Sequence, residues 1–215
     1  MRAFVSVAFT ILTISSLAQK DTSESVIGIG YTFGLNRSIL HYMESEAFLN
    51  TVTNNLEISA VNSIGASVGF TLDYDWTPKV TQRFSLLGLL NQGHLKFQFA
   101  EANPITKNVF TSGVEAATYI DYMLGKGKTQ PKVLTGFGMI IRNSIDGDEV
   151  PDISTFDLQL KIGGGVKLFR PKTRLNLDLV YSHSLTNLLL DSDEIQNQSL
   201  NILQKHYITL MFHGY

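Results

Sequence analysis

The stretch Ile64–Trp76, which reads IGASVGFTLDYDW, decides the fold because apolar and polar residues alternate along it one by one. Side chains of a β-strand point to opposite faces with a period of two. One face of this segment therefore carries Ile, Ala, Val, Phe, Leu, Tyr and Trp, and the other carries only Ser, Gly, Thr and Asp. Such a contrast is typical of a strand with lipid outside and a polar lumen inside.

The same alternation recurs along the whole chain, in segments that are mostly long enough for the ~9–11 residues a tilted strand needs to cross a bilayer. The predicted strands are Ser25–Arg37, Asn62–Trp76, Arg83–Phe99, Val109–Leu124, Pro131–Asn143, Thr155–Phe169, Thr173–Thr186 and Lys205–Tyr215. In the third strand the apolar phase shifts near Gly93, which predicts a bulge. The pattern predicts an all-β fold, an eight-stranded antiparallel up-and-down transmembrane β-barrel; only the facing of the last strand stays open.

The predicted connections alternate between long and short. The short ones are Thr77–Gln82, Gly125–Gln130 and Arg170–Lys172, and the long ones are His41–Val61, Ala100–Asn108, Ser144–Ser154 and Asn187–Gln204. Outer-membrane barrels have short periplasmic turns and longer outer loops. This alternation of short and long connections predicts an integral protein of the cell outer membrane. A soluble barrel that holds an apolar ligand is an alternative, but it would need apolar residues inside.

The first residues have the order of a secretory signal. Arg2 precedes an apolar run, and small residues follow at Ser16 and Ala18. We expect residues 1–18 to be a cleaved signal peptide and residues 19–215 to be the barrel domain. The apolar run is too short for a helix that spans a membrane, which needs roughly 20 residues.

Composition excludes several functions. The 215 residues include 17 basic and 19 acidic ones, so no strong charge attracts nucleic acid. Cysteine is absent, which removes disulfides, thiol catalysis, cysteine-based metal sites and a lipidated cysteine anchor.

Charged residues on the predicted inner faces form the candidate site. These lumen charges are Asp73, Asp75, Glu115, Asp121, Arg142, Asp157, Lys161, Lys167, Arg174 and Asp178. An eight-stranded barrel is only wide enough for side chains to fill, and buried charges need partners. We therefore expect a structural plug of paired charges with little or no conductance. An ion path or a small ligand site is the alternative.

Two other groups of residues suggest a catalytic or a metal site, but only weakly. His183 and Ser184 could form the nucleophilic pair of a lipid-modifying hydrolase, yet strand parity places them on opposite faces. The acidic loop residues Asp146, Asp148, Glu149 and Asp152 could hold Ca²⁺, but the spacing lacks the glycine and closing glutamate of an EF-hand loop. We expect no catalytic residue, no cofactor and no metal site.

Aromatic residues gather near the predicted strand ends. They are Tyr74, Trp76, Tyr119, Tyr122, Tyr181, Tyr207, Phe212 and Tyr215. Outer-membrane barrels carry aromatic girdles at both membrane interfaces, so we expect these side chains to meet the lipid headgroups.

Several segments resemble a known family. They are Gly34–Ser38, the LGKGKTQPKVLTG stretch that ends at Gly136, Asp157–Val166 (DLQLKIGGGV) and Tyr181–Leu188 (YSHSLTNL). Together they resemble the PorT-like outer-membrane β-barrels typical of Bacteroidetes. The resemblance implies an eight-stranded outer-membrane barrel but no single shared activity; the namesake of the family takes part in type IX protein secretion.

These observations lead to one main hypothesis and two alternatives. The main one is a non-enzymatic outer-membrane barrel with a structural or surface-interaction role carried by its long outer loops. The alternatives are a component of a type IX secretion or gliding machinery and a lipid A-modifying enzyme. The expected partners are outer-membrane lipid and lipopolysaccharide, the barrel-insertion machinery and secretion-complex proteins, with no nucleic acid.

Overall fold

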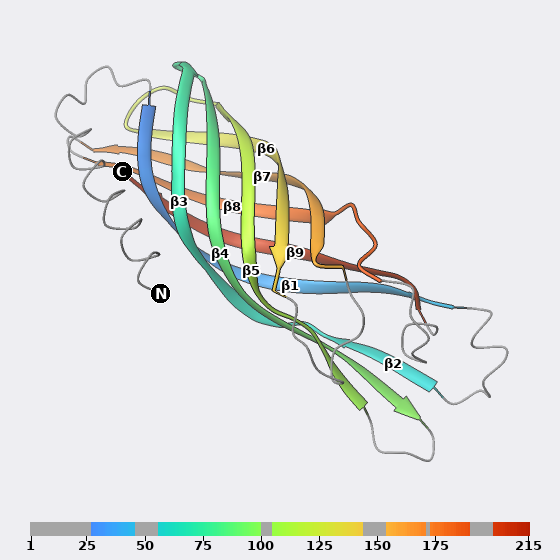
Figure 1. Cartoon of the computed structure of the whole chain (residues 1–215). Coiled ribbons are helices and arrows are strands. Elements are labelled where there is room, and N and C mark those ends of the chain that lie inside the picture. Colours follow the sequence, from blue (N-terminus) through green and yellow to red (C-terminus); the bar gives the residue numbers. More distant parts are fainter. Residues whose placement is uncertain (1–26, 46–55, 100–104, 144–153, 171–172, 190–199) are drawn as a thin grey trace, which may run out of the picture.

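The protein folds as a closed antiparallel β-barrel (Figure 1). The computed structural model describes residues 27–45, 56–99, 105–143, 154–170, 173–189 and 200–215. Within them the strands are β1 (Ile27–Glu44), β2 (Leu56–Val61), β3 (Ile64–Thr77), β4 (Val80–Phe99), β5 (Ile105–Met123), β6 (Thr129–Arg142), β7 (Phe156–Arg170), β8 (Thr173–Ser184) and β9 (Leu200–Gly214). None of the described residues belongs to a helix long and apolar enough to cross a membrane.

All of these strands except β2 form the barrel wall. Each pairs with its neighbour in the order β1-β3-β4-β5-β6-β7-β8-β9, and the pairing of β9 with β1 closes the ring. The predicted eight-stranded antiparallel fold is therefore confirmed. The predicted signal peptide, residues 1–18, lies outside the described residues.

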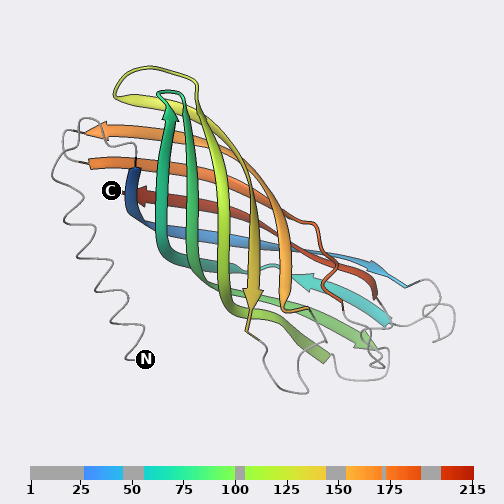
Figure 2. The same ribbon diagram turned by 45° about the horizontal axis from the view of Figure 1, so that its top comes forward.

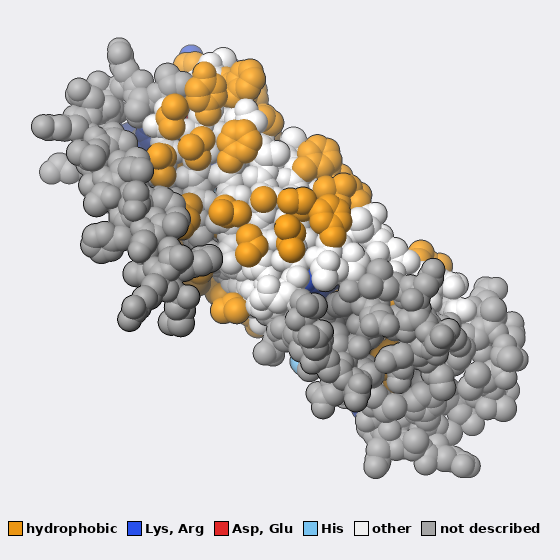
Figure 3. All heavy atoms as spheres, viewed as in Figure 1, with side chains coloured by type: hydrophobic (Ala, Val, Ile, Leu, Met, Phe, Trp, Pro, Cys, Tyr) orange, Lys and Arg blue, Asp and Glu red, His pale blue; other side chains and the backbone are white. Residues whose placement is uncertain are grey.

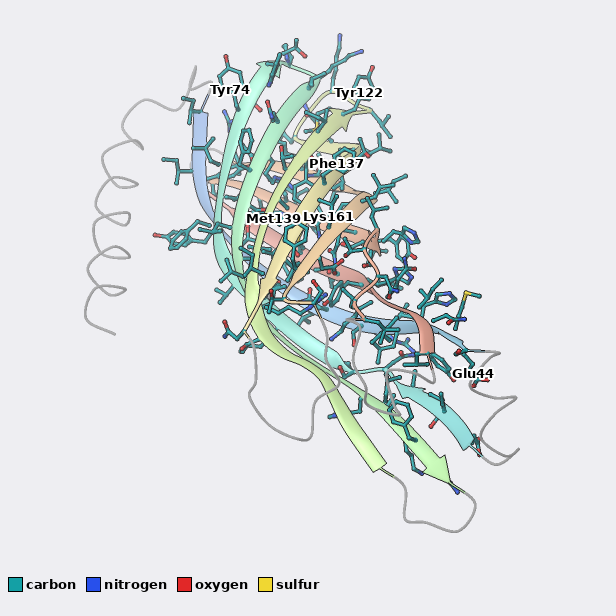
Figure 4. The ribbon with its side chains drawn as sticks, turned by 45° about the vertical axis from the view of Figure 1, so that its right-hand side comes forward. Glu44, Tyr74, Tyr122, Phe137, Met139 and Lys161 are labelled. Atoms are coloured by element: carbon teal, nitrogen blue, oxygen red, sulfur yellow. The ribbon has the colours of Figure 1, made fainter. Side chains whose placement is uncertain are left out.

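One end of the barrel carries short turns and the other carries the longer connections; we call them the turn end and the loop end. The β3–β4 turn and the β5–β6 turn lie at the turn end, together with the start of β1 and the end of β9 (Figure 1). In the β5–β6 turn, Gly127 has a φ of 119°, a conformation that side chains other than glycine rarely adopt. Tyr74 and Tyr122 lie near this end, whereas Glu44 lies at the opposite end of the molecule (Figure 4).

The outer and inner faces of the wall have opposite chemistry, as the alternation predicts. Tyr31, Phe33 and Leu35 of β1 are each close to half exposed on the outside, whereas Thr32 and Asn36, which have the opposite parity, are buried. Hydrophobic side chains are spread over the outer wall of the barrel (Figure 3). A wall that shows apolar side chains outward and buries polar ones inward is the reverse of a soluble protein and suits lipid.

The strands reach further toward the loop end than predicted. Strand β1 continues to Glu44, β9 begins at Leu200, and β2 lies inside the predicted loop His41–Val61. Among the described residues, β2 pairs with the end of β4 and with no other strand, so these segments form an extension beyond the closed ring (Figure 2). The long-loop prediction is wrong for these residues because their apolar side chains pack on one another across the extension.

The last strand, left open by its sequence, has a clear facing in the structure. Ile208 and Phe212 are exposed, whereas Tyr207 and His213 are buried in the lumen. Three of the predicted girdle aromatics therefore face inward: Tyr119, Tyr207 and Tyr215. They share strand parity with lumen charges, which sequence position near a strand end does not report. Outward-facing aromatics remain, namely Tyr74, Trp76, Tyr122, Tyr181 and Phe212.

Candidate functional site

A network of charges closes the lumen toward the turn end, with Arg83 of β4 at its centre. The Arg83 guanidinium lies 3.0 Å from Asp73, 2.5 Å from Asp121 and 2.8 Å from Asp178. These carboxylates come from β3, β5 and β8, so one side chain joins strands on opposite sides of the barrel. Arg83, Asp121 and Asp178 have no exposed side-chain surface.

Two further side chains balance the same carboxylates. The Lys132 ammonium lies 2.7 Å from Asp121 and 2.9 Å from Asp178. His213 lies 3.2 Å from Asp178 through Nε2, and its Nδ1 lies 2.6 Å from the Thr32 hydroxyl. We call Arg83, Lys132, His213, Asp73, Asp121 and Asp178 the turn-end network. Buried charges that are paired and hydrogen-bonded in this way cross the lumen as a plug.

Between this network and the turn end lie three more charged side chains, of which Asp75 and Arg174 are partly exposed and Lys167 is buried. The Arg174 guanidinium lies 3.1 Å from Asp75, and the Lys167 ammonium lies 3.5 Å from the same carboxylate. The Tyr215 hydroxyl donates a hydrogen bond to Asp73, which fixes the end of the chain to the plug.

A second polar group lies nearer the loop end, on β5 to β8. Lys161 lies 3.1 Å from Glu115 and 2.9 Å from the Ser182 hydroxyl. Arg142 lies 2.8 Å from Asp157, which also accepts hydrogen bonds from the Ser184 and Gln159 side chains. Gly138 makes room for this group, because a Cβ there would collide with the Lys161 side chain. Figure 4 shows Lys161 level with Met139, beyond Tyr122.

A cluster of buried, mostly apolar side chains lies around and between the two polar groups. Its buried members are Leu87, Leu89, Ala117, Tyr119, Leu134, Ile140, Val180, Tyr207 and Met211. On β8, for example, Val180 stands between Asp178 of the network and Ser182 of the second group. The lumen is therefore filled by side chains, with apolar residues packed beside the polar groups, as expected of a barrel this narrow.

The extension has its own apolar core, which we call the outer apolar cluster. It consists of Leu40, Ile58, Leu95, Phe97, Leu188, Leu200 and Leu203. Leu95, Phe97 and Leu203 are completely buried. The cluster joins β1 and β9 on one side of the extension to β2 and β4 on the other.

Strands β1 and β2 meet without a regular ladder in this extension. Individual hydrogen bonds join them and their neighbours: the Leu40 amide donates to the Asn62 side chain at 3.3 Å, and the Tyr42 hydroxyl donates to the Ile58 carbonyl at 2.6 Å. Partial burial, with Glu44 and Glu57 nearby, raises the pKa of Tyr42, so the phenol keeps the proton that it donates.

The structure places every predicted lumen charge on the inner face of the wall. Asp73, Asp121 and Asp178 belong to the turn-end network; Asp75, Lys167 and Arg174 lie between it and the turn end; Glu115, Arg142, Asp157 and Lys161 form the second group. Sequence reasoning missed Arg83, Lys132 and His213. A parity signal was present for two of them: Lys132 has the same strand parity as Arg142, and Arg83 alternates with the apolar Phe84 and Leu86.

The two weaker candidate sites, the His183–Ser184 pair and the acidic loop, can now be compared with the structure. The Ser184 hydroxyl faces the lumen and donates to Asp157 at 2.6 Å, whereas the His183 ring lies outside the wall and stacks on His206. The two side chains are thus on opposite faces and form no nucleophilic pair. The acidic segment that contains Asp146, Asp148, Glu149 and Asp152 lies outside the described residues.

Comparison with known proteins gives matches among solved structures only. No family model and no curated protein matches the chain. Three similar structures are the outer membrane protein OprG from Pseudomonas aeruginosa (9% identity, TM-score 0.48, 88% of this chain and 94% of that chain), the outer membrane protein AlkL (15%, 0.46, 91% and 94%) and a FadL homologue from Pseudomonas aeruginosa (11%, 0.37, 89% and 49%).

The assignment to a membrane follows from the chain's own surface and lumen. Exposed apolar side chains surround the wall, and paired charges fill the inside. Closed antiparallel barrels with this distribution of side chains are the proteins that cross bacterial outer membranes with strands. The protein is an integral β-barrel of the outer membrane.

Proposed function

We propose that the protein is a non-enzymatic outer-membrane frame that does not conduct ions and that presents its loop-end extension to partners at the cell surface. The observation that carries the proposal is the extension itself. Strands β1, β2, β4 and β9 are held together beyond the ring by a fully packed apolar cluster. Binding residues are commonly placed on loops that a rigid scaffold positions.

Exposed apolar side chains on the extension support contact with a partner. Met43 at the end of β1 is 49% exposed, and Val61 at the end of β2 is 46% exposed. Both residues lie past the strand segments that carry the lipid-facing side chains, so lipid does not account for them. Exposed apolar groups of this kind are typical of protein contact sites.

The charge plug supports the absence of a pore. An aqueous channel requires about 16 strands, whereas this barrel is narrow and Arg83 bridges it. In planar bilayers the purified protein should give no stable conductance steps. Regular open-channel steps would contradict this part of the proposal.

Photo-crosslinking in intact cells tests the surface role. A photoreactive amino acid at Met43 or Val61 should give a discrete crosslinked product, and the same amino acid at Lys79 in the β3–β4 turn should not. Lys79 is a matched control because it is exposed at the opposite end of the barrel. Absence of products at both loop-end positions would overturn the proposal.

A second candidate is a component of a type IX secretion machinery, which the glycine and turn signatures of the sequence favour. It predicts that a deletion strain loses many secreted proteins and retains their precursors in the periplasm. An unchanged set of secreted proteins would remove this candidate and leave the surface role. Both candidates share the barrel-insertion machinery as an expected partner during assembly.

A further inference from the structure

A cluster of nitrogen-bearing side chains lies on the outside of the barrel wall, just beyond the apolar surface of β8, β9 and β1. His183 of β8 stacks on His206 of β9 with ring centroids 4.6 Å apart, and the His41 ring of β1 lies 6.2 Å from that of His206. The three strands are neighbours in the wall (Figure 1). None of these rings takes part in the lumen networks described above.

Arg37 belongs to the same outer face. It is exposed on β1, four residues before His41, and its Cα pairs with that of Ile208 on β9, two residues from His206. Among the described residues, no carboxylate forms an ion pair with Arg37. The neighbouring Tyr181 ring lies 6.1 Å from His206 and 6.3 Å from His183. We call Arg37, His41, His183 and His206 the rim patch.

The depth of the rim patch is set by the strands themselves. Arg37, Ile208 and Tyr181 lie at one level of the wall, and the next outward residues toward the turn end are Leu35 on β1, Leu210 on β9 and Leu179 on β8, which pair with one another. Tyr181 stands between this apolar surface and the histidines. Aromatic residues mark the level of the lipid headgroups, so the rim patch lies at or just outside that level.

Hydrogen bonding fixes the tautomer of His206. Its Nδ1 lies 3.1 Å from the Ser184 backbone nitrogen, whose N–H must be the donor. In the neutral imidazole the proton therefore sits on Nε2, and the His206 ring is only 8% exposed beneath the exposed His41 and His183 side chains. An imidazole N–H beside a guanidinium provides the donors that an anion requires.

The same geometry does not suit a metal ion. The planes of His183 and His206 are 6° apart, so their in-plane lone pairs run parallel and do not converge on one point. His206 Nδ1 already accepts a hydrogen bond. Within the described ranges, no three His, Cys, Asp or Glu side chains are placed to hold a metal.

From the donors, the positive charge and the depth, we infer that the rim patch binds the phosphate of a lipopolysaccharide molecule in the outer leaflet. The inference rests on the outer-membrane placement with the loop end outward, but not on the surface-partner role. Arg37 supplies the charge and a two-pronged guanidinium that matches phosphate geometry, and the histidines supply further N–H groups. The apolar wall below the rim patch, which includes Leu35 and Leu179, then contacts the acyl chains.

Native mass spectrometry of the full chain in detergent tests the inference. Titration with diphosphoryl lipid A should give one bound molecule per chain. Replacement of three rim residues (Arg37→Ala, His41→Ala and His206→Ala) should weaken binding about tenfold or more, because each charge-assisted bond to phosphate is worth roughly a factor of ten. Lys79→Ala, which removes an exposed cation at the turn end, should leave binding unchanged.

The controls separate the possible sources of phosphate and guard against misfolding. Arg37→Lys keeps the charge and should retain most of the binding, and every variant should show the heat-dependent shift in electrophoresis that marks a folded barrel. Equal lipid A binding by the triple variant would overturn the inference. So would equally tight binding of phosphatidylcholine, or displacement of lipid A by inorganic phosphate at equal concentration, since the latter would make the patch a site for free phosphate.

Discussion

The membrane-spanning barrel and the loop-end extension are built from the same strands with opposite interiors. On β4, Phe84 and Leu86 face outward near the turn end, and Arg83 and Ser85 are buried in the lumen. Further along the same strand, Leu95 and Phe97 are completely buried. The inward side chains of β9 change in the same way, from His213 near the turn end to Leu203 in the extension, both of them buried.

This difference shows that the surroundings of the wall decide the chemistry of its inside. Within the bilayer the outer face must be apolar, so polar side chains are confined to the lumen, where they need partners. Beyond the bilayer the outer face meets water, and burial of apolar side chains inside becomes favourable. Strand register near Gly93 is irregular, as predicted, yet Leu89 and Leu95 both remain inward. The apolar residues of β4 therefore move from the outer face to the inner face at the point where the strand leaves the membrane.

Removal of Arg83 should have the largest effect. The change Arg83→Ala leaves Asp121 and Asp178 to Lys132 and takes from Asp73 the cation that lies 3.0 Å from it. Loss of one partner from a buried ionic network costs about 3–5 kcal/mol. The urea midpoint of unfolding in detergent should fall sharply, or the heat-dependent electrophoretic shift should disappear.

Gln82→Ala is the matched control for this experiment. Gln82 is next to Arg83 but faces the outside of the wall, where its side chain accepts a hydrogen bond from Trp76 at 3.1 Å. Its removal should change the midpoint little, because surface substitutions commonly cost under about 0.5 kcal/mol. Similar midpoints for both variants would show that the lumen network contributes no special stability.

Removal of Phe97 should have a comparable but local effect. Phe97→Ala opens a cavity in the outer apolar cluster, and such changes cost about 3–5 kcal/mol. The extension should open while the ring below stays intact, because the hydrogen-bonded ring does not depend on the cluster. Hydrogen exchange should accelerate in β2 and in the first residues of β9, but not in β6 or β7.

Phe84→Ala is the matched control for Phe97→Ala. It removes the same side chain from the same strand, at a position where lipid or detergent fills the space. We expect a smaller loss of stability and unchanged exchange in the extension. Faster exchange in β2 for both variants would contradict the separation of the two regions.

The comparison between barrel and extension also explains which parts of the structure could be predicted from the sequence. Strands inside the bilayer were predictable because lipid on one side and a polar lumen on the other impose a strict period of two over many residues. Strand β2 was not predictable, because it is short and its inner face is apolar, the reverse of the pattern inside the bilayer. The lumen charges could be found from strand parity, but their partners could not: Arg83 and Asp178 are 95 residues apart, and only closure of the barrel brings them together.

The smallest expected effect belongs to Arg174, whose ion pair resembles those of Arg83 in chemistry but not in burial. The Arg174 and Asp75 side chains are 27% and 28% exposed, whereas Arg83 and Asp121 are fully buried. Water and salt screen an exposed pair, so Arg174→Ala should cost at most about 1 kcal/mol, and added salt should reduce the difference further. The urea midpoint at low and high salt measures both quantities. A loss as large as that of Arg83→Ala would mean that position in the network, and not burial, determines the strength of these pairs.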